Sequence, residues 1–203
     1  MKIIGLTGQS GAGKGAACAI FQKYGIPSVD TDAVYHALLA VNGPCTQELI
    51  AAFGTDILSE AGLVDRKKLA QTVFGKPNTA NLLHTLNTIT HKYIMAETHR
   101  LLQTYAQNGA DAALIDAPQL FEAGAQKDCD LVVAVLAPRA VRLARITARD
   151  GISEEAAVRR IDAQKPDAFY REHCDAILEN DGDLHALEEQ IRGFLIKYNV
   201  GLL

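Results

Sequence analysis

A glycine-rich turn between a short apolar run and a helical run constrains this chain most strongly. Residues 3–6 are apolar on both alternating faces, which predicts a buried strand, and residues 16–24 have a helical pattern. Between them, Gly8-Gln9-Ser10-Gly11-Ala12-Gly13-Lys14 fits the spacing GxxxxGK. A buried strand that runs through a glycine turn into a helix is typical of a parallel sheet covered by helices.

The chemistry of this turn favours a bound polyphosphate. Its glycines let the backbone curl so that several amides point into one concavity, the helix N-terminus adds positive potential, and Lys14 adds a mobile charge. The residue after the lysine, normally a Ser or Thr whose hydroxyl binds Mg²⁺, is Gly15. Water, Ser10 or Thr7 could take the place of that hydroxyl, and the sequence leaves these alternatives open.

Four further short apolar runs predict strands, and helical stretches separate them. They lie at residues 26–29, 112–115, 131–136 and 176–178. Strand followed by helix, five times, indicates an α/β layered domain. Residues 30–111 are too long for a simple crossover and carry helical signals, which predicts a helical insertion. Those signals lie at residues 46–53, 66–74 and 78–107.

Carboxylates follow two of the predicted strands. Asp30 and Asp32 are spaced so that both side chains lie on the same side of an extended segment, at the edge of a parallel sheet where ligands bind. One could accept a proton from an attacking hydroxyl while the other orients groups or water around a metal. Alternatively, an aspartate could cap a helix over residues 33–40. Asp116 is either a water-mediated magnesium ligand or an ordinary strand end, and Glu122 either reaches the same crevice or lies in a helix's first turn.

Arginine is concentrated in residues 138–174, which contain seven of the ten arginines in the chain. On a helix that begins near Pro138, Arg142, Arg145 and Arg149 would emerge from one face. They could form a solvated face that pairs with nearby acids. Beside a polyphosphate, a lid that brings in Arg145 or Arg149 would stabilise the charge of phosphoryl transfer.

Composition excludes several classes of function. The formal charge of −4 gives no general attraction to nucleic acid, and no apolar run is long enough to span a membrane. The beginning of the chain lacks the features of a signal peptide, so we expect a cytoplasmic protein. The four cysteines are widely spaced without a CxxC pair, which favours reduced thiols over zinc ligands or disulfides.

Beyond the loop, an ordered series of motifs resembles the dephospho-coenzyme A kinase family, nearly from end to end. The series comprises Gly5 to Gly8, Asp30-Thr31-Asp32, Gly62 to Arg66 with Leu69 and Phe74, Ile89-Thr90-His91, Asp116 to Glu122, Arg145 with Arg149 to Glu155, Arg160 with Gln164, and Asn180 with Gly182.

The resemblance implies a three-layer P-loop kinase fold with a five-stranded parallel sheet. The core would comprise residues 1–30, 108–137 and 175–203, with a helical substrate-binding insertion at 31–107 and a lid at 138–174. It also implies transfer of the γ-phosphoryl group of ATP to the 3′-hydroxyl of dephospho-coenzyme A, with Mg²⁺ as cofactor.

The resemblance further implies roles for individual residues. Asp32 would be the general base, Lys14, Arg145 and Arg149 the catalytic cations, and Asp116 the metal ligand through water. The expected ATP-binding residues are Gly8, Ser10, Gly11, Ala12, Gly13, Lys14, Gly15, Ala16 and Asn180. Of these, Asn180 would border the adenine. The expected acceptor-binding residues are Thr7, Asp30, Asp32, His91, Pro118, Leu120 and Glu122.

The chain departs from the family pattern at four positions. Gly15 replaces the hydroxyl residue, Lys92 a Pro, Gln119 a Leu and Arg142 a Gln. Two alternative functions therefore remain: a kinase for another nucleotide or small alcohol, and a nucleotide-binding regulator in which the loss of the hydroxyl at Gly15 has abolished catalysis.

Overall fold

A computed structural model describes residues 1–75 and 79–201 of the chain. The chain divides into two compact units. Unit 1 comprises Met1–Val29 and Leu102–Leu203, and unit 2 comprises Asp30–Leu101. The assignment of residues 31–107 as a substrate-binding insertion and of 138–174 as a lid stays a prediction.

Five strands form the sheet, in the order β2-β3-β1-β4-β5. Their bounds are β1 Lys2–Gly8, β2 Ser28–Asp30, β3 Ala112–Asp116, β4 Leu131–Leu136 and β5 Ala176–Glu179. Strand β1 pairs in parallel with β3 and with β4, and β4 pairs in parallel with β5. The predicted five-stranded parallel sheet is therefore confirmed. Strand β2 begins at Ser28 rather than at residue 26, because Pro27 has no N–H to donate to a ladder.

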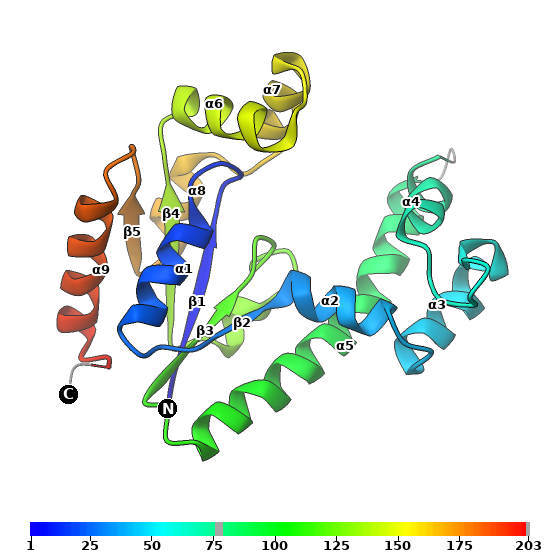
Figure 1. Ribbon diagram of the computed structural model, residues 1–203, viewed down its shortest axis with the longest axis horizontal. Coiled ribbons are helices and arrows are strands. Elements are labelled where there is room, and N and C mark those ends of the chain that lie inside the picture. The colour runs from blue at the N-terminus through cyan, green and yellow to red at the C-terminus, as the bar shows by residue number, and fades with distance from the viewer. Residues whose placement is uncertain (76–78, 202–203) are drawn as a thin grey trace. The chain divides into compact units, whose positions relative to one another are not determined.

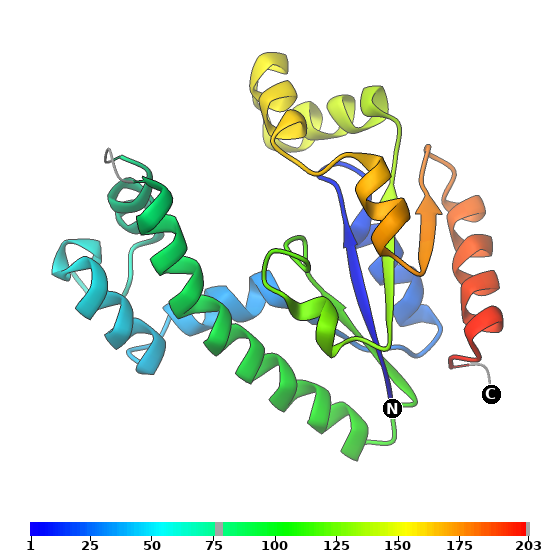
Figure 2. The same ribbon diagram turned by 180° about the vertical axis from the view of Figure 1, so that it is seen from behind.

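Helices cover both faces of the sheet, as Figures 1 and 2 show from opposite sides. On one face, α1 (Lys14–Lys23) and α9 (Leu184–Tyr198) meet through an edge-to-face contact of Phe21 with Phe194, 5.9 Å between ring centroids. On the other face, Tyr170 of α8 (Asp167–His173) packs in a buried cluster with Ala134 and Leu136 of β4. The predicted three-layer α/β architecture is confirmed.

The carboxyl ends of the parallel strands lie at one edge of the sheet. Strand β1 ends there at Gly8, β3 at Asp116 and β5 at Glu179, so the segments that follow them converge. After β4 the chain enters α6 (Arg139–Asp150) and α7 (Glu154–Asp162), which pack on each other through Ile146, Ala157 and Ile161. This edge carries most of the predicted site residues of unit 1.

Unit 2 is helical and has its own core. It contains α2 (Thr31–Leu39), α3 (Pro44–Phe53), the 3-10 turn η1 (Thr55–Ile57), α4 (Arg66–Phe74) and most of α5 (Thr79–Gln107). The fully buried side chains of its core include Leu49, Ile57 and Val73. The sequence pattern of the long helix begins at Asn78, which lies outside the described residues. No helix in the described ranges combines the length and the apolar character needed to cross a membrane.

Candidate active site

The glycine-rich turn folds into a loop that leaves helix amides available for an anion. Gly11 and Gly13 have φ values of 78° and 99°, in the left-handed region that favours glycine. The amide of Ala12 closes a turn on the Gln9 carbonyl at 3.0 Å. Among the described residues, no hydrogen bond uses the amides of Gly13 and Lys14, which open α1. A phosphate oxygen is the natural acceptor for such groups.

The carbonyl side of the loop is held by two side chains from other elements. Asn180, just after β5, is buried and donates its Nδ2–H to the Ala12 carbonyl at 2.7 Å. Arg145 of α6 donates to the carbonyls of Gly11 and Ala12, both at 3.3 Å, and to that of Asn180 at 3.1 Å. Because C=O and N–H point oppositely in a trans peptide, fixing the Ala12 carbonyl also fixes the Gly13 amide.

Replacement of Gly13 by alanine is expected to weaken ADP binding about tenfold or more, because the loop amides would move from their places. An added Cβ would collide with Nδ2 of Asn180, on top of the strain of a positive φ. Isothermal titration calorimetry measures the effect. Gly25→Ala is the matched control, since Gly25 has a φ of 76° but nothing within 4 Å of an added Cβ. Unchanged ADP affinity in Gly13→Ala would show that this packing does not shape the loop.

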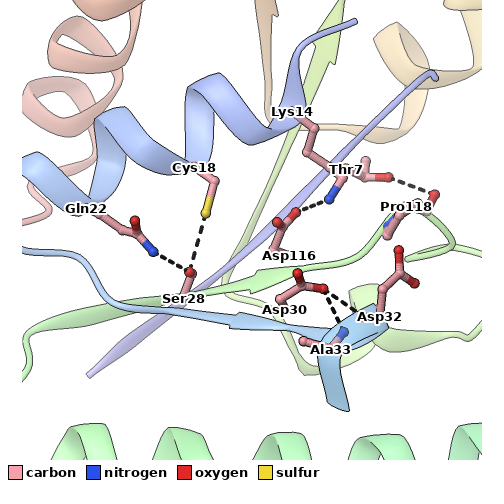
Figure 3. A network of polar contacts seen from close by, with 10 residues as sticks. All are labelled: Thr7, Lys14, Cys18, Gln22, Ser28, Asp30, Asp32, Ala33, Asp116 and Pro118. Atoms are coloured by element: carbon pink, nitrogen blue, oxygen red, sulfur yellow. Dashed lines mark hydrogen bonds and ion pairs between the residues drawn. The ribbon is translucent and has the colours of Figure 1, made fainter. Parts of the chain in front are cut away.

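The lysine of the loop reaches the end of the neighbouring strand. Its Nζ forms an ion pair with Oδ1 of Asp116, the last residue of β3 (Figure 3). Asp116 is only 6% exposed, so its charge is held in a poorly solvated place beside a cation. The structure thus brings together the predicted phosphate-binding lysine and the predicted metal-binding carboxylate.

Four other predicted nucleotide-binding residues lie along the same segment. Gly8 ends β1, and Ala16 is in the first turn of α1. The Ser10 amide donates to Oε1 of Gln164 at 3.0 Å, so it is engaged within the protein. Gly15 has nothing within 4 Å of where a Cβ would be, so space for a hydroxyl-bearing side chain exists there.

The predicted acceptor-binding residues of unit 1 divide between surface and core. The Thr7 hydroxyl donates to the Pro118 carbonyl at 3.4 Å, and Pro118 is exposed. Glu122 is also exposed and lies 3.6 Å from the Lys165 ammonium. Thr7 and Leu120, by contrast, have no exposed surface. The Leu120 side chain packs beneath Gly5 and belongs to the core, so we do not assign it a substrate contact.

Arg142, Arg145 and Arg149 of α6 have the predicted helical spacing, but their environments differ, so the expectation that all three emerge is wrong for Arg142. Among these three arginines, only the Arg145 side chain has a hydrogen bond to the loop in the described part of the chain, whereas Arg142 lies against Gly11 through its backbone. Arg142 is 5% exposed, donates from Nε to the Ala137 carbonyl at 3.1 Å and has a pKa lowered by burial. Arg149 is exposed and pairs with Asp150 at 2.7 Å, and this arginine is the main cause that lowers the pKa of Asp150 to about 2. Arg142 is buried because its first-turn position faces the chain leaving β4.

The aspartates of unit 2, Asp30 and Asp32, have separate roles. The expectation that both lie on one extended segment is wrong, and the alternative of a helix cap is confirmed, with the helix starting at Thr31. Asp30 ends β2 and caps α2, since its Oδ1 accepts from the amides of Asp32 at 2.9 Å and Ala33 at 3.1 Å. The helix therefore starts at Thr31, which places Asp32 in its first turn. The carboxylate of Asp32 is exposed and takes no part in this cap (Figure 3).

Two further sequence positions of interest lie on α5 in unit 2. His91 is half-buried, and burial lowers its pKa, so its imidazole is neutral at pH 7. Lys92 pairs with Glu48 at 2.6 Å, and the Tyr93 hydroxyl donates to the same carboxylate at 2.9 Å. This network gives Lys92 a partner. Nothing in the structure explains Gln119.

Comparison with known proteins identifies close relatives over nearly the whole chain. The sequence model of the family described as dephospho-CoA kinase matches residues 2–186. A dephospho-CoA kinase of Carboxydothermus hydrogenoformans is 35% identical over 98% of this chain and 95% of its own length. The Arabidopsis thaliana dephospho-CoA kinase is 36% identical over 97% of this chain and 84% of its own.

Solved structures agree with this similarity. A Thermus thermophilus protein has a TM-score of 0.78 with 31% identity and covers 97% of both chains. A shikimate kinase of Bacteroides thetaiotaomicron shares only the fold, with a TM-score of 0.56 and 15% identity over 98% of this chain and 99% of its own. The family's sequence model covers nearly the whole chain, and the glycine-rich loop ends in Lys14, which pairs with Asp116. The chain therefore belongs to the dephospho-CoA kinase family.

Proposed function

We propose that this protein transfers the γ-phosphoryl group of ATP to the ribose 3′-hydroxyl of dephospho-coenzyme A, forming coenzyme A. The observation that carries the proposal is the loop itself. In the described part of the chain its Gly13 and Lys14 amides make no hydrogen bond, its carbonyls are held by Asn180 and Arg145, and Lys14 lies at its end beside Asp116. Such a loop binds a polyphosphate, and family membership supplies the acceptor.

The residues of unit 1 have separate tasks in this reaction. Lys14 and the amides of Gly13 and Lys14 bind the phosphates and hold the transferred group in line. Arg145 keeps the loop carbonyls turned away from these anions, which makes it a positioning residue with a positive charge close to the site. Arg149, which is exposed, is the cation available to a moving lid.

Asp32 is the general base in this proposal. It accepts the proton of the acceptor's 3′-hydroxyl as the oxygen attacks the γ-phosphorus, and the ADP oxygen leaves from the opposite side. Because Asp30 supplies the helix cap, the Asp32 carboxylate is not needed for that task. Asp30, His91, Pro118 and Glu122 remain the residues proposed to border the acceptor, together with Thr7, whose hydroxyl donates to the Pro118 carbonyl.

The side chains at the loop fit a divalent cation. Asp116 presents a hard carboxylate oxygen beside Lys14, and the open space at Gly15 has room for water in place of a hydroxyl ligand. We propose that Asp116 holds Mg²⁺ through water and that Gly15 leaves one further position to solvent. The ion would neutralise charge on the β and γ phosphates.

Replacing Gly15 by serine is expected to lower the Mg²⁺ concentration for half-maximal activity, by about three- to tenfold, because it restores a hydroxyl ligand. The side chain has room, since nothing lies within 4 Å of the new Cβ. Mn²⁺ binding by electron paramagnetic resonance, with ADP present, measures metal affinity independently of turnover. Gly15→Ala, which adds the Cβ but no oxygen, is the control. Equal Mn²⁺ affinity in both variants would rule out a hydroxyl-accessible metal position at Gly15.

A coupled assay for ADP tests the proposed function. ADP release should depend on dephospho-coenzyme A and should be absent with adenosine, shikimate or gluconate as acceptor. Release with one of those acceptors alone would favour a kinase of different specificity. Gly15 specifically favours a second candidate, a nucleotide-binding regulator, and ADP binding without transfer at saturating Mg²⁺ would establish it.

A further inference from the structure

Two glutamines connect the glycine-rich loop at residues 8–14, here called the phosphate loop, to the segment between α7 and α8. Gln9 donates its Nε2–H to the Lys165 carbonyl at 3.1 Å and to Oδ1 of Asp167 at 2.8 Å. Gln164 accepts the amide hydrogen of Ser10 on Oε1 at 3.0 Å. We call these three hydrogen bonds the glutamine clamp. All of its members belong to unit 1.

The clamp depends on the donor end of Gln9. Both of its partners are acceptors, so only the Nε2 group can face them, which fixes the orientation of the amide. Gln9 is 4% exposed, and its Oε1 is buried without a hydrogen-bond partner in the described part of the chain. An unsatisfied buried oxygen is costly, so the two donated bonds must offset that cost for the residue to remain in place.

The clamp holds the part of the loop that the carbonyl contacts do not reach. Asn180 and Arg145 fix the loop at Gly11 and Ala12, whereas the clamp fixes Gln9 and Ser10. It also joins the loop to Asp167, which begins α8 and whose charge partly opposes the burial effect on the pKa of Arg142. The loop is therefore anchored at both ends before a nucleotide arrives. Nucleotide binding then costs less conformational entropy of the loop.

We propose that Gln9 and Gln164 are positioning residues that set nucleotide affinity by fixing the phosphate loop against the connection between α7 and α8. The proposal rests on the proposed function, because it assumes that the loop binds a nucleotide. It assigns no chemistry to either glutamine. Loss of the clamp should therefore raise the KM for ATP while leaving kcat nearly unchanged.

A charge-swap series tests the proposal with ADP calorimetry, which needs neither acceptor nor transfer. Gln9→Glu sets a carboxylate against two acceptors and should weaken ADP binding about tenfold or more. Asp167→Asn retains an acceptor oxygen for Gln9 and should stay within about threefold of the original protein. In the double variant Gln9→Glu with Asp167→Asn, the new side-chain amide can donate to the new carboxylate, and most of the lost affinity should return.

Neutral variants supply the second arm. Gln9→Met keeps the volume, removes the donor and should raise both the Kd for ADP and the KM for ATP about tenfold, with kcat within about twofold. Gln22→Met is the control, since Gln22 of α1 makes an exposed hydrogen bond to Ser28 at 2.8 Å. Gln22→Met should change neither the Kd for ADP nor the KM for ATP.

The outcomes distinguish failure of the clamp from failure of the proposed function. If the double variant binds no better than Gln9→Glu, the loss comes from charge repulsion with the phosphates and the clamp is refuted. ADP affinity that stays unchanged in Gln9→Met, or a fall in kcat with constant KM, also refutes it. If the original protein binds no ADP, the proposed function fails, and the clamp proposal fails with it.

Discussion

Lys14→Met is expected to lower kcat/KM for ATP, with dephospho-coenzyme A as acceptor, by about 10³-fold. The reason is that the main mobile cation at the transferred phosphoryl group would be lost. The measurement is steady-state ADP release at saturating acceptor. The variant also removes the cation beside Asp116, which is only 6% exposed. We therefore expect a lower melting temperature as well, because the buried carboxylate loses its ion pair with Lys14.

The double variant Lys14→Met with Asp116→Asn separates these two effects. Neutralising Asp116 removes the buried charge, so the double variant should recover much of the melting temperature but none of the activity. A single Lys14→Met protein that keeps its fold and more than about a tenth of its activity would contradict the assigned role. Recovery of activity in the double variant would show that the defect was one of folding.

Asp32→Asn is expected to lower kcat by about 10²-fold or more, because an amide cannot accept the proton of the 3′-hydroxyl. ADP affinity and melting temperature should stay near those of the original protein, since Asp30 caps α2 and the Asp32 carboxylate is exposed. Single-turnover mixing of enzyme, ATP and acceptor measures the chemical step directly.

The control for Asp32→Asn is Asp56→Asn, which neutralises another exposed aspartate of unit 2. It should have normal kcat. If Asp32→Asn transferred phosphate at a near-normal rate, Asp32 would be excluded as the base. A rise in the acceptor KM with unchanged kcat would instead indicate a binding role.

The features that could be predicted from the sequence are those determined by neighbouring residues. The loop follows from glycines placed between a strand and a helix, and α4 follows from the apolar spacing of residues 66–74. Asp116 could be placed at the sheet edge because it ends an apolar run. In each case the relevant interactions lie within a few positions of one another.

The features that sequence reasoning missed depend on contacts between distant positions. Gln9 bonds to Asp167, 158 positions away, and Asn180 to Ala12, 168 positions away. The pattern GxxxxGK leaves position 9 unspecified, so it gives no sign of the clamp. Helical spacing placed Arg142 beside Arg145, but burial against the chain that leaves β4 depends on tertiary packing.

Two local preferences of the backbone compete at the aspartate pair Asp30 and Asp32. Spacing two residues apart predicts a shared face only if the strand continues. Asp30 is also a favourable helix cap, and its two hydrogen bonds to the amides of Asp32 and Ala33 start α2 immediately. The cap prevails, and the carboxylates take different roles.

Transfer of a radioactive γ-phosphoryl group tests the central claim most directly. The folded protein, mixed with γ-labelled ATP, Mg²⁺ and dephospho-coenzyme A, should place the label on coenzyme A, from which an enzyme specific for ribose 3′-phosphates releases it. Label that remains on ATP, or appears only as inorganic phosphate, would contradict the account.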